Sequence, residues 1–254
     1  MDSNSEVEKS GPRRWDLRET AWLVTTAYGA AQWRKAHPSA RSMVDRPQFC
    51  SYHYHEADGM LTEYIESRLE DGLWSALEDQ QEFSYLMVKI RANIVAFVQS
   101  LHALADTCSH MLYYSLALDV APKPLSERGI NANSVLKLME ARRPSVSQNF
   151  GRLCDSFRAM TSGASYSYLA ALSNTSKHRS VIRPSLNEDM TGERKDRWAL
   201  LLESFSYDGT FYKESDVREF MRSEHDRIQA LTVDIGIELN EFLKSTQTSS
   251  SQGP

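Results

Sequence analysis

Apolar residues recur at helical intervals along most of the chain. The clearest example is the stretch 73–118, which contains neither Gly nor Pro over 46 residues. Its apolar positions are three or four residues apart, as on one face of an α-helix; they are Ile94, Phe97, Val98, Leu101, Leu104, Cys108, Met111, Leu112 and Leu116. The pattern predicts either one long bent helix or two helices that meet near Gln81.

Two weaker patterns predict helices before this stretch, joined by an irregular segment. Residues 15–36 carry an apolar stripe that stops before His37-Pro38, because proline disfavours helical geometry in the residue that precedes it. Residues 58–69 carry a second stripe. The connection over residues 38–57 contains two prolines and an aromatic cluster. We expect it to be a loop.

The second half of the chain predicts three shorter helices and one long one. The expected ranges are 131–142 (with Asn133 or Ser134 as the N-cap), a segment after Pro144, 164–179 and 215–244. Gly236 weakens the last of these, since glycine is a poor helix former.

A β-like pattern separates the last two helices. Apolar and aromatic residues fill 181–186 and 198–207, and Asp208-Gly209 leads into a further run at 210–213. Asp-Gly between such runs is a strong signal for a hairpin. The sequence therefore predicts a mainly-α, up-and-down helical bundle with a small β-hairpin inserted at about residues 181–213.

The bundle is expected to form a single domain over residues 15–244. Residues 1–14 are polar and mixed in charge, and residues 245–254 contain no large apolar side chain. We predict that the first segment is a flexible lead and the last a disordered tail, because neither can bury apolar surface.

Composition places the chain among ordinary globular proteins. It is 41% hydrophobic and 25% charged, with a net charge of −5, which excludes collagen-like and wholly disordered classes. The first residues lack a basic start and an apolar run, and no later run is long enough to span a bilayer. We expect a soluble cytoplasmic protein without membrane contact, whose three cysteines stay reduced.

Charge is unevenly distributed along the chain. Residues 56–90 hold 9 acidic and 2 basic side chains, a net charge of −7, whereas residues 137–197 hold 11 basic and 6 acidic ones, a net charge of +5. Two solvated faces of opposite sign would explain this distribution. Alternatively, the basic segment binds an anion such as RNA phosphate.

Two groups of polar residues are candidates for chemistry. His102, Asp106 and His110 are spaced by four residues and lie on one side of the long predicted helix, either as ligands of a divalent metal or as a hydrogen-bonded polar edge.

The second group is Asn174, Lys177, His178 and Arg179, at the end of a predicted helix. A histidine beside two cations suits proton transfer, and the cations suit phosphate binding. A polar helix end that complements the helix dipole is the alternative.

A third candidate is the aromatic segment 49–55, in which Cys50, His53 and His55 supply three zinc-ligand types. Packing against the bundle is the simpler explanation, since no second cysteine is nearby. The chain has no glycine-rich phosphate loop, nucleophile elbow or dinucleotide fingerprint. No cofactor is therefore predicted.

Two segments of the chain together resemble the HEPN (higher eukaryotes and prokaryotes nucleotide-binding) superfamily. They are Ser100-Leu-His-Ala-Leu-Ala-Asp-Thr107 and Asn174-Thr-Ser-Lys-His-Arg179. The resemblance covers about residues 85–180 and the last helix. It implies a four- or five-helix up-and-down bundle, often dimeric, that cuts RNA without a metal, as in bacterial toxin–antitoxin and antiviral defence systems.

The resemblance also implies roles for individual residues. Asn174 and His178 occupy the polar and histidine positions of the family motif, and Ser173 replaces its arginine, so that Lys177 or Arg179 must substitute or cleavage is lost. The same Arg-to-His spacing occurs at Arg46–His53 and Arg218–His225, at the rate expected by chance.

Three hypotheses follow. The first is an RNA-binding or RNA-cleaving protein with His178 as acid/base, Asn174 as its positioning partner, Lys177 and Arg179 on phosphate, and His102, Asp106 and His110 in support. The second is a catalytically silent module that binds another protein. The third is a metal-dependent enzyme that uses the three supporting residues and His178. Expected partners are RNA, a second copy of the chain, and an antitoxin or other protein.

Overall fold

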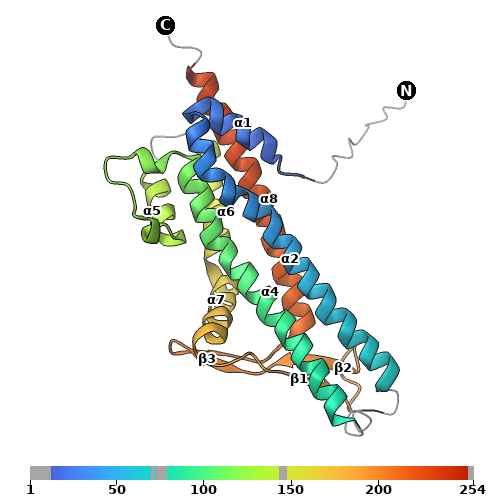
Figure 1. Cartoon of the computed structure of the whole chain (residues 1–254). Coiled ribbons are helices and arrows are strands. Elements are labelled where there is room, and N and C mark those ends of the chain that lie inside the picture. Colours follow the sequence, from blue (N-terminus) through green and yellow to red (C-terminus); the bar gives the residue numbers. More distant parts are fainter. Residues whose placement is uncertain (1–12, 70–71, 73–78, 143–147, 251–254) are drawn as a thin grey trace, which may run out of the picture.

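Three long helices lie side by side and form the body of the molecule (Figure 1). The computed structural model describes residues 13–69, 72, 79–142 and 148–250. Helix α2 (Ala30–Arg68) runs antiparallel to both α4 (Gln80–Ser115) and α8 (Val217–Ser250). The predicted mainly-α bundle is therefore confirmed.

Helix α4 begins at Gln80 and is continuous to Ser115, so a helix boundary lies at the break that was predicted near Gln81. The Asp79 side chain accepts a hydrogen bond from the backbone N–H of Glu82 at 2.9 Å and caps the helix N-terminus. The predicted apolar stripe is buried throughout, with Ile94, Phe97 and Leu101 at most 1% exposed. The residues of this stretch before Asp79 lie outside the described part of the chain.

The prediction of a loop over residues 38–57 is wrong, because α2 passes through both Pro38 and Pro47. Each proline removes one backbone hydrogen bond and costs about 3 kcal/mol inside a helix. Burial offsets this cost, since one face of α2 packs along the whole of α4. The buried residues on that face are again three, four or seven apart: Ala36, Ala40, Met43, Cys50, Ala57, Leu61 and Tyr64.

The helix predicted over residues 15–36 is divided at Gly29. Helix α1 (Leu17–Tyr28) ends just before this glycine, and α2 begins just after it, at Ala30. Gly29 has a φ of +89°, a backbone conformation that side chains with a Cβ rarely adopt. The chain turns at this point, and α1 packs against α2 and α8 at the same end of the bundle.

Three shorter helices complete the bundle, connected to α4 through η1 (Leu118–Val120) and η2 (Glu127–Gly129). They are α5 (Ala132–Arg142), α6 (Gln148–Thr161) and α7 (Gly163–His178). Helix α6 packs on α8, whereas α7 packs on α4. Asn131, not Asn133 or Ser134, caps α5, because its side-chain oxygen accepts a bond from the Ser134 N–H at 3.0 Å.

The β-strands lie at one end of the bundle, beside the end of α7 and the start of α8 (Figure 1). Strands β1 (Pro184–Glu188), β2 (Trp198–Leu202) and β5 (Ser215–Asp216) form an antiparallel sheet in the order β1-β2-β5. Strands β3 (Phe205–Tyr207) and β4 (Thr210–Tyr212) form the predicted hairpin. Its turn residues Asp208 and Gly209 both have positive φ, as two-residue hairpin turns favour.

Two boundaries differ from those predicted. The strands extend from residue 184 to 216, slightly beyond the expected insertion. The predicted tail is helical as far as Ser250, and the Gln247 amide donates to the Leu23 carbonyl at 3.3 Å. Residues 1–12 and 251–254 lie outside the described residues.

Candidate functional site

The predicted phosphate-binding residues lie at the C-terminal end of α7. Lys177, His178 and Arg179 are exposed, and Asn174 is half-buried one turn earlier. The helix ends at His178, and the Arg179 N–H still donates to the Thr175 carbonyl at 2.9 Å. These side chains are open to solvent at a helix end.

His102 faces this helix from α4. Its ring stacks on that of Tyr166, with ring centroids 6.1 Å apart and planes inclined by 12°. Burial lowers the pKa of His102, the positive charge of Lys177 lowers it further, and Asp106 acts in the opposite direction. His102 is therefore neutral at neutral pH and can accept a proton.

Tyr166 was not identified from the sequence. It lies eleven residues before Lys177, or about three turns, so both side chains project from the same face of α7. Burial raises the pKa of the Tyr166 hydroxyl, and the Asp106 carboxylate raises it further. The structure thus places His102 against Tyr166, and the charges of Lys177 and Asp106 act on this pair. We call these four residues from two helices the α4–α7 site: His102, Asp106, Tyr166 and Lys177.

The other predicted residues face another direction or make contacts elsewhere. His178 is one position beyond Lys177 and therefore turned about 100° away around the helix axis. The Arg179 guanidinium lies 4.8 Å from the centre of the Tyr207 ring in the hairpin. His110 is two turns beyond His102, and its Nδ1 lies 3.8 Å from a carboxylate oxygen of Glu127.

The position of the missing motif arginine is inside the protein. Ser173 is 0% exposed, and its buried hydroxyl has no hydrogen-bond partner among the described residues. A guanidinium at this position would have no space and no solvent. The resemblance to the arginine-containing motif therefore does not extend to residue 173.

Several exposed cations of the basic segment 137–197 form no ion pair with a described carboxylate, and three of them lie at or just after the end of α7. Other arginines of the basic segment 137–197 form ion pairs, for example Arg152 with Glu238 at 2.9 Å and Arg158 with Asp155 at 2.7 Å. In contrast, Lys177, Arg179 and Arg183 are exposed and form no ion pair with a described carboxylate. These three cations make the end of α7 a candidate anion-binding surface.

The structure gives no support to a metal site at either group of candidate ligands. Within the described residues, no three side chains of the types His, Cys, Asp and Glu gather as metal ligands would. Cys50, His53 and His55 lie on α2 instead of on a loop, and His53 is hydrogen-bonded to Asn93 of α4 at 2.8 Å. Burial raises the pKa of the Cys50 thiol to about 12, so this cysteine stays protonated.

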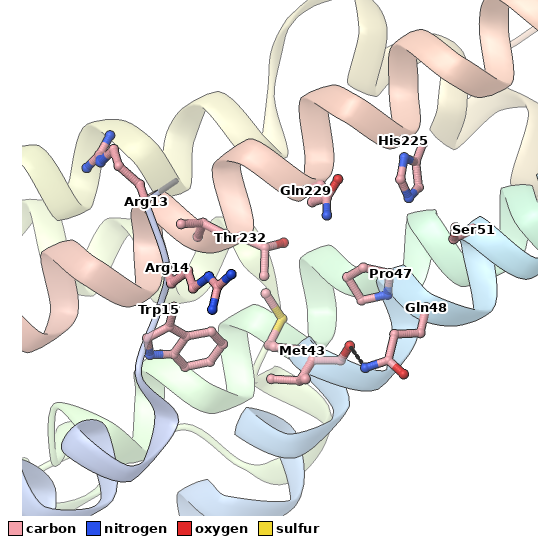
Figure 2. Close-up of a pocket in the computed structure, with 12 residues that line it drawn as sticks. Arg13, Arg14, Trp15, Met43, Pro47, Gln48, Ser51, His225, Gln229 and Thr232 are labelled. Carbon is pink, nitrogen blue, oxygen red and sulfur yellow. Dashed lines mark hydrogen bonds between the residues drawn. The ribbon is translucent and has the colours of Figure 1, made fainter. Parts of the chain in front are cut away.

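A second feature, absent from the sequence predictions, is a cavity of about 590 Å³ between α2 and α8. Residues from three distant segments line it: Arg13, Arg14, Trp15, Met43, Val44, Pro47, Gln48, Ser51, His225, Gln229, Thr232 and Val233. Figure 2 shows how they converge. His225 borders this cavity, whereas its motif partner Arg218 is bound to Asp58 and Thr62 of α2.

Comparison with known proteins gives no match: no family model, curated protein or solved structure is significantly similar to the chain. None of the helices in the described ranges is both long and apolar enough to cross a membrane.

Proposed function

We propose that the chain is a HEPN-like protein that binds RNA at the α4–α7 site and cleaves it by metal-independent acid–base chemistry. One observation carries the proposal: His102 lies half-buried against Tyr166, and its pKa is lowered first by this burial and then by the charge of a lysine from another helix. A neutral histidine beside a cation combines the two requirements of phosphate transesterification, a base and a positive charge.

The proposed reaction draws on residues of both helices, His102 from α4 and the polar residues at the end of α7. His102 takes the proton of the ribose 2′-hydroxyl, and the 2′-oxygen attacks the adjacent phosphorus. Lys177 and Arg179 stabilise the negative charge that develops on the phosphate. His178, positioned by Asn174 one turn earlier, donates a proton to the departing 5′-oxygen. The products are a 2′,3′-cyclic phosphate and a free 5′-hydroxyl.

RNA binding is tested by the fluorescence anisotropy of a labelled single-stranded RNA over a range of salt concentrations. We expect Lys177→Met and Arg179→Met each to weaken binding. Each should also reduce the magnitude of the slope of log K against log salt concentration by about 1, the contribution of one phosphate contact. Lys123→Met is the control, because Lys123 is exposed on a turn outside the basic segment. Equal effects of all three variants, or no binding by the wild type, would contradict the proposal.

A second candidate function is a catalytically silent interaction module. The buried position of Ser173 favours it, because the chain lacks the arginine that organises the phosphate in the HEPN motif. So do two pairs of more than half-exposed apolar residues at helical spacing, Phe49 with Tyr52 on α2 and Tyr85 with Val88 on α4.

This alternative predicts a dimer or a protein complex that does not depend on the proposed catalytic residues. Sedimentation of the wild type and of the His178→Ala variant over a range of concentrations measures it. Self-association that is equal in both, combined with the absence of RNA binding, would favour the module over the nuclease.

A further inference from the structure

The cavity between α2 and α8 has the size and lining of a small-molecule site. Its volume of about 590 Å³ lies in the range of ligand pockets in other proteins, roughly 300–1,000 Å³. Apolar side chains form part of the lining, which we call the apolar wall: Trp15 from the N-terminal segment and Met43, Val44 and Pro47 from α2. Polar side chains from the N-terminal segment, α2 and α8 form the rest, which we call the polar wall. It is separate from the α4–α7 site, so the inference does not rest on the proposed function.

The apolar wall is held in place by contacts outside the cavity. The Trp15 indole N–H donates to Thr20 at 2.8 Å, and its ring lies so close to Gly236 that a Cβ there would be 2.1 Å from the ring. Gly236 is thus the reason that Trp15 can lie flat against α8. An aromatic wall fixed in this way is preorganised for a ligand.

The polar wall contains a buried hydroxyl without a partner. Thr232 is 5% exposed, and its Oγ1 makes no hydrogen bond to any described group. Threonines inside helices commonly bond to the carbonyl four residues earlier, and an unsatisfied buried hydroxyl costs about 1–3 kcal/mol. In Figure 2 this hydroxyl and the Arg14 guanidinium point toward the same space.

The charge of the cavity is positive. Arg13 is neutralised by Asp234 at 2.8 Å, but Arg14 forms no ion pair with a carboxylate in the described ranges. His225 also lines the cavity, and its Nδ1 lies 3.4 Å from a carboxylate oxygen of Asp226, whose side chain is 71% exposed. A free guanidinium beside an unpaired hydroxyl is a receptor for an anionic oxygen.

We propose that this cavity binds a small organic anion, with an apolar body against Trp15, Met43 and Pro47 and a carboxylate or phosphate between Arg14 and Thr232. The ligand restores the missing partner of Thr232 and balances the charge of Arg14. A carboxylate and a phosphate would make the same kind of contacts with Arg14 and Thr232. The experiment below therefore includes one probe of each kind.

Calorimetric titration of the full chain tests the proposal with three matched probes, 2-naphthylacetate, 2-naphthyl phosphate and the uncharged 2-naphthaleneethanol. We expect one or both anions to bind at least about tenfold more tightly than the alcohol, because a charge-assisted bond contributes about this much. The stronger anion identifies the head group. Equal binding of all three, or no binding of any at millimolar concentration, would overturn the proposal.

Two variants locate the site. Arg14→Gln should weaken anion binding about tenfold or more, and Thr232→Val should weaken it several-fold without lowering the melting temperature of the free chain, since it removes an unpaired hydroxyl at constant volume. Arg34→Gln, an exposed position on α2 outside the cavity, is the control and should leave binding unchanged. Affinity within twofold of the wild type in both site variants would show that the anion binds elsewhere.

Discussion

At the scale of single residues, the two histidines of the proposed nuclease occupy very different environments. His102 is half-buried, stacked on Tyr166 and exposed to the field of Lys177, whereas His178 is at a helix end in solvent. Burial and a neighbouring cation both disfavour a charged imidazole. This difference favours His102 as the base of the proposed reaction.

The lowered pKa of His102 predicts a specific dependence of stability on pH. The folded chain binds a proton at His102 less readily than the unfolded chain, whose histidines titrate near 6.5. The stabilisation is therefore complete above about pH 6.5 and is lost as the pH falls through the lower pKa of the folded state. Urea unfolding at several pH values should show that His102→Gln loses less stability on acidification than the wild type.

Exposed His55 provides the control for this measurement, since it lies on α2 away from the α4–α7 site. His55→Gln should retain the pH dependence of the wild type. An NMR titration that gives His102 a pKa at or above 6.5 would show that the assigned environment is wrong.

The buried position of Ser173 predicts the outcome of restoring the family motif. Ser173→Arg places a charged side chain at a site that is 0% exposed, so we expect a loss of about 3 kcal/mol or more in the free energy of unfolding. Asn174→Arg, at the adjacent half-buried position, should be tolerated. Denaturant unfolding of the two variants measures the difference, and a stable Ser173→Arg protein with increased RNA cleavage would refute this reading of the motif.

At the scale of elements, helix α2 shows why the sequence prediction failed for one part of the chain. Its buried positions from Ala36 to Tyr64 follow a helical spacing that is visible in the sequence, but Pro38 and Pro47 are stronger local signals for a break. The packing of α2 along α4 keeps this segment helical, and the rules that predict structure from neighbouring residues take no account of such packing. The hairpin was predictable because Asp208-Gly209 specifies its turn locally.

Two glycines on different helices should respond oppositely to the same substitution. Gly236→Ala would place a Cβ 2.1 Å from the Trp15 ring, and we expect the displaced indole to cost about 1–3 kcal/mol. Gly59→Ala meets nothing within 4 Å on α2 and should stabilise the chain by about 0.5–1 kcal/mol, because alanine is the better helix former. Thermal or denaturant unfolding compares them; a stabilising Gly236→Ala would mean that Trp15 does not pack there.

At the scale of the whole molecule, the candidate sites depend on contacts between distant segments. Lys177 was predicted as a phosphate ligand and His102 as a supporting residue, but their proximity depends on how α7 packs on α4. The only signal for Tyr166 in the sequence is its position three turns before Lys177, on the same face of the predicted helix. The α2–α8 cavity could not be predicted, since its lining comes from residues 13–15, 43–51 and 225–233.

The proposed nuclease activity is tested most directly by cleavage of a mixed RNA pool in EDTA, with four purified proteins compared at equal concentration. We expect the wild type and His55→Gln to cut RNA and to leave 2′,3′-cyclic phosphates. His102→Gln and His178→Ala should each lose about 100-fold or more in rate, as expected for loss of a general base or acid. Equal cutting by all four, or no cutting by folded wild-type protein at high concentration, would contradict the account.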